Sequence, residues 1–295
     1  MTSQGDLLTP VEGIRRHLRR NIRSYITGTP DASLELAAPH ERWHGANAAT
    51  TTVHTSWAML IGGLESLFMQ TLHPPTMAGV AEHSAYEQDP LGRLHRTAQF
   101  VALTSFGTTQ QAEDAIALVR GIHERVRGVT PDGIEYSAMD SHNLLWVHVT
   151  EIDGFLRAFQ RYGSVDLSVQ QADLYVAEMA CVGEALGIDR APKTVSELDA
   201  TIASYRPELH MSAQSRKAVR FLLIPPLAAP ARAGYGVILP AALTLLPAWA
   251  RNKLRIPPPL PFTDRLVVEP AARGLLKGLD WIMEAESRRD AAHQT

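Results

Sequence analysis

The residue of this sequence best suited to chemistry is a histidine flanked by arginines. Ile116, Val119 and His123 recur at three- and four-residue steps, which put side chains on one face of a helix. The imidazole therefore takes a position where a core leucine is usual. Arg120 and Arg127 lie three residues before and four residues after it, on adjoining turns of the same predicted helix.

This combination predicts a bound molecule that carries both a metal and carboxylates. Cations beside a buried imidazole cost free energy unless an anion compensates them. Haem would satisfy both groups, because its iron takes an axial imidazole and its propionates pair with arginines. The absence of CxxCH predicts that this haem is not covalently attached. The alternative is a hydrogen-bonded core histidine without a cofactor.

A second helix is predicted to face the same site. Arg93, Arg96, Thr97 and Phe100 share one face of the segment that precedes Gly107. Two cations, a hydroxyl and an aromatic ring would then line a pocket. The alternative is that both arginines are surface charges that answer nearby acidic residues.

The helices that position these residues have recognisable ends. Asp89 and Pro90 are a cap and first-turn proline for the first helix, and Gly128 is read as the stop of the second. Further helices are expected at 53–73, 76–86, 141–160, 169–186, 195–205 and 264–284. The helix at 141–160 carries His148 on its inward stripe, and His73 lies at a helix end before two prolines. His54 and His83 are weaker candidates for the same cavity.

The chain as a whole is predicted to be mainly helical, because the period-two alternation of strands is scarce. We expect residues 1–52 to form a basic helix and an irregular lead-in, residues 53–250 the main domain with proline-broken helices at its end, and residues 251–295 a proline-rich connector and a last helix. The basic helix, 10–26, is either a solvated face of a packed terminal helix or a weak membrane-surface contact.

Composition excludes several classes of function. The net charge is −3 with acids and bases intermixed, which gives no electrostatic footprint for nucleic acid. A single cysteine, Cys181, and no signal-peptide pattern predict a reduced, cytoplasmic protein. The dinucleotide, Walker, HExxH and GxSxG signatures are absent.

Several spaced motifs between about His54 and Phe159 resemble one known family. They resemble the haem-binding catalytic domain of bacterial rubber oxygenases (latex-clearing proteins) and fungal MpaB-type oxygenases. The motifs are His73-Pro74, Gly79-Val80-Ala81-Glu82-His83-Ser84, Gly92-Arg93-x-x-Arg96-Thr97-x-x-Phe100, Arg120-x-x-His123-x-x-x-Arg127-Gly128 and Trp146-Val147-His148.

The resemblance implies an all-α, globin-like domain around one non-covalent haem b. It implies that His123 is the proximal iron ligand, with Arg120 and Arg127 close to the haem and with Arg93 and Thr97 on the paired helix. Arg96 falls where rubber-cleaving members carry a lysine. Because a guanidinium stays protonated and ligates iron poorly, the resemblance does not extend to a lysine-ligated iron.

The sequence therefore predicts a haem-dependent oxygenase, with dioxygen or peroxide as oxidant. Its expected substrate is a small apolar molecule, with alkenes as one class. Arg93, Arg96 and Thr97 are the expected catalytic residues, and His123, Arg120, Arg127, Arg93 and Phe100 are expected to bind the cofactor. Two alternatives remain open: a haem carrier or gas sensor without turnover, and a helical interaction module without a cofactor.

Overall fold

The computed structural model describes residues 37–45 and 48–293, and over these the chain is mainly helical, as predicted. The basic helix expected at 10–26 lies outside the described residues. The elements in chain order are η1 (Pro39–Glu41), α2 (Ala49–His54), α3 (Met59–Gln70), α4 (Pro74–His83), α5 (Pro90–Phe106), α6 (Thr109–His123), β1 (Arg127–Val129), β2 (Glu135–Ser137), α7 (Ser141–Tyr162), α8 (Val169–Leu186), α9 (Val195–Tyr205), α10 (Ala213–Leu223), α11 (Ala229–Leu245), α12 (Ala248–Leu254), the π-helical η2 (Asp264–Val268) and α13 (Glu269–His293).

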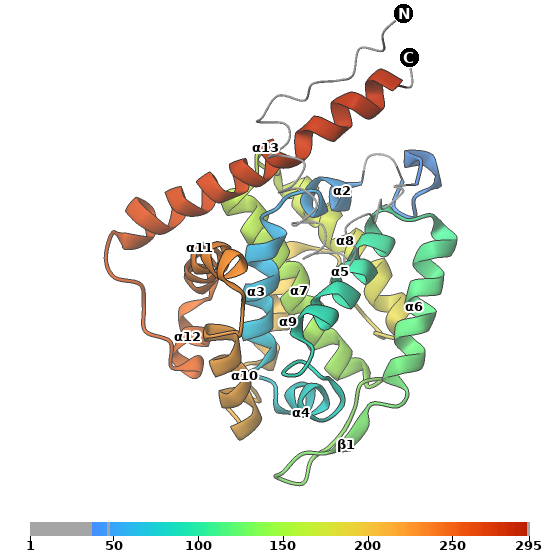
Figure 1. Ribbon diagram of the computed structural model, residues 1–295. Coiled ribbons are helices and arrows are strands. Elements are labelled where there is room, and N and C mark those ends of the chain that lie inside the picture. Colours follow the sequence, from blue (N-terminus) through green and yellow to red (C-terminus); the bar gives the residue numbers. More distant parts are fainter. Residues whose placement is uncertain (1–36, 46–47, 294–295) are drawn as a thin grey trace, which may run out of the picture.

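The centre of the fold is the pair of helices α3 and α7, which lie side by side in Figure 1. Gly62 and Gly154 meet at their crossing. A Cβ on Gly62 would lie 2.3 Å from the backbone oxygen of Gly154, and a Cβ on Gly154 would lie 2.6 Å from the oxygen of Gly62. Because neither glycine has a Cβ, the backbones of α3 and α7 can touch here.

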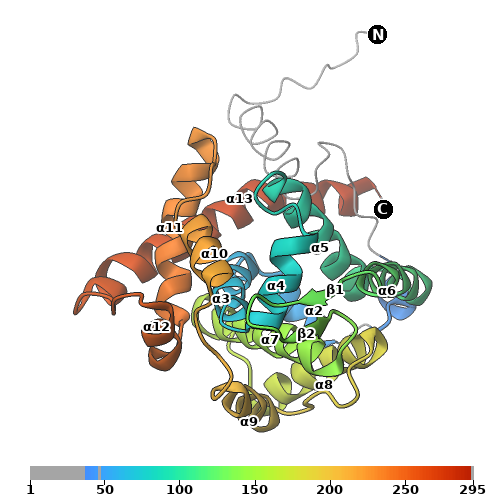
Figure 2. The same cartoon turned by 90° about the horizontal axis from the view of Figure 1, so that it is seen from below.

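The other helices cover this pair. The stripe predicted on 141–160 is confirmed, since His148, Ile152, Phe155 and Phe159 are buried and Leu145 is partly buried. Helices α8 and α9 pack on α7, and α11 packs on α3. Helix α13 runs across α11 along one edge of the molecule (Figure 1). Figure 2 shows α4 between α10 and the small hairpin of β1 and β2.

The predicted proline breaks separate α10, α11 and α12, although Pro240 lies inside α11. No single helix of the described part is long and apolar enough to cross a membrane. Residues Ala231–Leu245 and Ala248–Leu254 meet that criterion only as a pair, bent by 115°.

One carboxyl group is buried at the central crossing. Glu65 on α3 is fully buried, and neither of its carboxyl oxygens has a hydrogen-bond partner within residues 37–45 and 48–293. Burial, followed by the carboxylate of Asp153, raises the pKa of Glu65 to about 8, although Arg157 opposes the shift. The group is therefore protonated in the folded protein at neutral pH.

We expect Glu65→Gln to become more stable than the wild type as the pH rises from about 5 to 8. In that window the folded wild type keeps a proton that the unfolded chain, with a pKa near 4.5, has released, so its free energy of unfolding falls. The variant does not lose this free energy, so at pH 7 its free energy of unfolding should exceed that of the wild type by about 1 to 3 kcal/mol. Chemical denaturation across this range measures it, with the exposed Glu135→Gln as control. Parallel pH profiles for wild type and Glu65→Gln would contradict the assignment.

The prediction that the helix of His123 continues to a stop at Gly128 is wrong. Helix α6 ends at His123, and the chain turns into an antiparallel hairpin in which Arg127 pairs with Ser137 and Gly128 with Tyr136. Gly128 is therefore no helix stop. A Cβ there would lie 2.7 Å from the Tyr136 hydroxyl, so this glycine admits the tyrosine ring. Residues 131–133 form the tip of the hairpin, where Gly133 has φ +88°.

Candidate functional site

Helices α5 and α6 form the framework of the candidate site. The Asp89 side chain accepts a hydrogen bond from Gly92 N at 2.9 Å, which confirms the predicted cap of α5. Only Gly107 and Thr108 separate the two helices, so they run antiparallel and pack on each other. This arrangement places the first turns of α5 and the last turn of α6 at the same end of the pair (Figure 1).

His123 is the last residue of α6 and is half-buried. It continues the stripe of Ile116 and Val119, as predicted. Its Nδ1 is buried and has no hydrogen-bond partner among the described residues. Burial lowers the pKa of His123, so the imidazole is neutral at physiological pH. A neutral imidazole with an unpaired ring nitrogen has the donor chemistry that a metal requires.

The predicted face of α5 is only partly covered. Exposed Arg96 and Thr97 lie in its first half, followed by half-buried Phe100 and buried Thr104. Arg96 pairs with Asp89 at 3.4 Å, and both side chains are more than half exposed, which matches the surface-charge alternative. Thr97 Oγ1 donates to the Arg93 carbonyl at 3.1 Å.

Arg93 is the arginine of α5 that lies farthest from solvent. It is half-buried, and burial is the main influence that lowers its pKa. Its Nη1 donates to Ser84 Oγ at 3.0 Å. Ser84 caps the C-terminal end of α4, so this bond joins two of the sequence motifs in space. Sequence reasoning gave Ser84 no role of its own.

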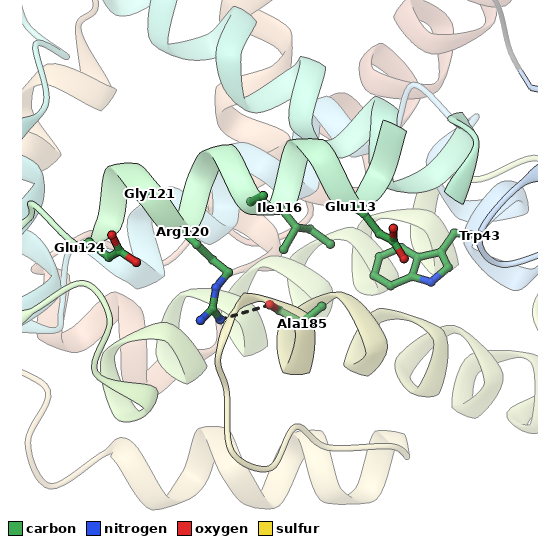
Figure 3. Close-up of a pocket in the computed structure, with 8 residues that line it drawn as sticks. Trp43, Glu113, Ile116, Arg120, Gly121, Glu124 and Ala185 are labelled. Carbon is green, nitrogen blue, oxygen red and sulfur yellow. Dashed lines mark hydrogen bonds between the residues drawn. The ribbon is translucent and has the colours of Figure 1, made fainter. Parts of the chain in front are cut away.

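The two arginines near His123 lie in different environments. Arg120 is half-buried, and its Nη1 donates to the Ala185 carbonyl at 3.3 Å, in the last turn of α8 (Figure 3). A cation there stabilises the partial negative charge of the helix end. Arg127 is exposed at the start of β1. The structure therefore gives Arg120 a structural role between helices and leaves Arg127 open to solvent.

A cavity of about 380 Å³ lies beside α6, on the side that faces α8 (Figure 3). It is partly open, and His123 is not among its lining residues. It borders Ile116 of the His123 stripe but does not reach the candidate ligand itself. The lining residues are Trp43, Glu113, Ile116, Ala117, Arg120, Gly121, Glu124 and Ala185.

The remaining histidine candidates are constrained by their neighbours. Both ring nitrogens of His54 are engaged, by Ser105 at 2.6 Å and by Tyr175 at 3.1 Å. His83 is exposed on α4. The Nε2 of the buried His148 has no hydrogen-bond partner among the described residues, and it faces Gly183 of α8, where a Cβ would come within 3.0 Å of it.

The same residues can be tested for their fit to a haem. Its iron requires an unpaired imidazole nitrogen, and His123 offers one. Its propionates require cations that are not already neutralised, and Arg93 has a serine as its hydrogen-bond partner among the described residues. The residues therefore fit the group in kind.

Comparison with known families decides the class of protein. Residues 51–281 match the family model described as "ER-bound oxygenase mpaB/B'/Rubber oxygenase, catalytic domain". The chain belongs to this oxygenase family. No curated protein and no solved structure matches the chain. The match extends beyond the motifs between His54 and Phe159, through the C-terminal helices and into α13.

Membership in the MpaB and rubber oxygenase family makes the chain an oxidoreductase of the oxygenase class. The resemblance drawn from the spaced motifs is thereby confirmed. The family match assigns no role to an individual residue, so the site residues rest on the geometry above.

Proposed function

We propose that this protein is a haem b-dependent oxygenase that acts on a small apolar molecule, with His123 as the proximal iron ligand. The observation that carries the proposal is the buried Nδ1 of His123, which belongs to a neutral imidazole and has no partner in the part of the chain that the structure describes. The oxygenase class of the family supports it as well.

Each predicted site residue has a place in this proposal. Arg93 and the exposed Arg127 would supply positive charge for the propionates, while Arg120 would hold α6 against the end of α8. Thr97 and Arg96, on the open half of the α5 face, would border the side where oxidant and substrate approach. Phe100 would provide an apolar wall between that face and the core. The helices around the cofactor would then form the globin-like pocket that the resemblance implies.

The chain would contribute binding, orientation and electrostatics. A bound haem supplies the activation of dioxygen or peroxide. The Ser84 hydroxyl accepts a hydrogen bond from the Arg93 guanidinium and so orients this cation from the end of α4. Thr97 donates its one hydroxyl proton to the Arg93 carbonyl, so its oxygen is left as an acceptor, and only the cation suits an anionic group.

The proposal is tested by the absorption spectrum of protein produced with a haem precursor. We expect a Soret band that acidified organic solvent removes from the protein, because no CxxCH is present to bind the group covalently. Protein without a Soret band, even after addition of haemin, would exclude the proposal.

Oxygen uptake with candidate alkenes then separates an oxygenase from a haem carrier or gas sensor. We expect uptake that depends on both haem and alkene. A stable Soret band with no uptake for any apolar substrate would favour the carrier or sensor.

A further inference from the structure

Three side chains from separate parts of the chain meet at the N-terminal end of α7. They are His73, which caps α4, His142, the second residue of α7, and Glu208, in the loop that follows α9. One potential ligand atom from each lies within 4.8 Å of the other two. None of these residues belongs to the haem site proposed above.

The environment of His73 leaves one ring nitrogen available. The side chain is 1% exposed, and its Nδ1 lies 2.7 Å from Thr76 Oγ1. If Nδ1 donates this bond, Nε2 keeps a lone pair for a cation. Ligating histidines commonly have their second nitrogen held by such a neighbour. Burial, the largest influence, lowers the pKa of His73 to about 4, so the imidazole is neutral.

His142 is held rigidly beside it. The Tyr205 ring stacks on the His142 ring with centroids 4.4 Å apart and planes at 20°. The Tyr205 hydroxyl donates to the His142 carbonyl at 2.7 Å. The His73 ring lies 5.8 Å from the His142 ring, at a steep angle. The two imidazoles are therefore ordered before any ligand arrives.

Glu208 completes the group from a tethered loop. Its Oε1 lies 2.9 Å from His142 Nε2. Its own backbone N donates to the Tyr205 carbonyl at 3.1 Å, and His210 N donates to the Leu72 carbonyl, next to His73, at 2.8 Å. The side chains of His142 and Glu208 are 53% and 42% exposed, which gives an ion a route from solvent.

We propose that His73, His142 and Glu208 bind a divalent transition-metal ion, best represented by Zn²⁺. Two imidazoles and one carboxylate are a ligand set typical of zinc sites that keep a fourth, open position, whereas Mg²⁺ and Ca²⁺ prefer oxygen ligands. Tetrahedral zinc with bonds of ~2.0 Å separates its ligand atoms by about 3.3 Å. The 2.9 Å pair would open by about 0.4 Å around the ion, and the other two separations, which are at most 4.8 Å, would close by up to about 1.5 Å.

The competing explanation is an ion pair between His142 and Glu208 beside a structural His73. Such a pair requires protonated His142 and would bind no metal. The two explanations differ in one property, which is whether the purified chain takes up zinc at this place.

The test is calorimetric titration of the untagged, chelator-treated chain with zinc chloride, with and without haem loaded. We expect uptake of one strong-binding equivalent in both states. His142→Ala and Glu208→Gln should each weaken it by about tenfold or more. Each removes an atom that binds the ion directly, and loss of a residue that only orients a ligand already costs about 10- to 100-fold. Substituted Co²⁺ should give the intense visible bands of a tetrahedral site, and these should be lost in both variants.

The matched control is His83→Ala, which removes an exposed histidine of the same α4 helix and should leave uptake unchanged. Circular dichroism confirms that the variants, whose changes are at partly exposed positions, are folded. The proposal is overturned if the wild type takes up no zinc, or if His142→Ala and Glu208→Gln bind it as tightly as the wild type. Because the titration needs no haem, a failure to bind zinc leaves the proposed oxygenase function intact. A missing Soret band would likewise leave the zinc proposal intact.

Discussion

His123→Ala is expected to lose the Soret band of the wild-type protein, or to retain haem at least about tenfold more weakly, a change of about 1.4 kcal/mol or more. The imidazole is the protein's axial ligand to the iron in our proposal, and an alanine provides no replacement. The effect on folding should be small, because His123 is half-buried and its Nδ1 makes no hydrogen bond to a described residue that the substitution would break. Absorption spectra at equal haem supply measure the outcome.

His148→Ala is the matched control. It also removes a histidine with a ring nitrogen that has no partner among the described residues, but this histidine is buried and faces Gly183 of α8. We expect it to lower the free energy of unfolding by about 1 to 3 kcal/mol while the Soret band persists. Free imidazole added to His123→Gly should restore part of the spectrum. Loss of the band in His148→Ala or His73→Ala, with retention in His123→Ala, would move the ligand to another helix.

Gly62→Ala is expected to destabilise the fold by about 2 kcal/mol or more. The new Cβ would lie 2.3 Å from Gly154 O, 2.6 Å from Gly154 C and 2.9 Å from Phe155 Cα. All three are backbone atoms of α7, so no side chain can rotate away, and the two central helices must separate. Thermal or chemical denaturation should show the loss directly.

Gly63→Ala provides a control one residue further along α3. There the nearest neighbour of the new Cβ would be Phe155 Cε1 at 3.4 Å, close to an ordinary contact. The alanine should be neutral or stabilise the helix by up to ~1 kcal/mol through its higher helix propensity. Equal stability of the two variants would show that α3 and α7 separate without cost.

Much of the helical framework could be predicted because its ends carry side-chain chemistry. The helices at 169–186 and 195–205 have the predicted bounds, and Gly187 ends the first of them with φ +118°. The predicted helix at 53–73 is instead divided into α2 and α3, with a break before Met59. That break has no proline or glycine to mark it in the sequence.

The candidate site was harder to predict where contacts cross the fold. Helical spacing correctly placed His123 on an inward stripe, but it could not show that Arg96 pairs with Asp89 or that Arg120 reaches Ala185 of α8. Arg127 was wrongly placed on the helix of His123. Apolar residues on either side of a turn, here Val126, Val129 and Ile134, are also the pattern of a short hairpin, but two strands of three residues give too little alternation to recognise. His142 and Glu208 are 66 residues apart, and no spacing pattern links them.

The hairpin has a consequence for local stability. A two-stranded ribbon of this size is not stable alone in water, so β1 and β2 depend on α4, where the Tyr136 hydroxyl donates to Glu82 at 2.6 Å and the Tyr136 ring lies against Gly79. These segments should open and close as one cooperative unit, at a free energy below that of global unfolding. Amide hydrogens of β1, β2 and the end of α4 should therefore exchange with solvent at a common rate. Because β1 begins four residues after His123, each opening would also release the chain that follows the last turn of α6.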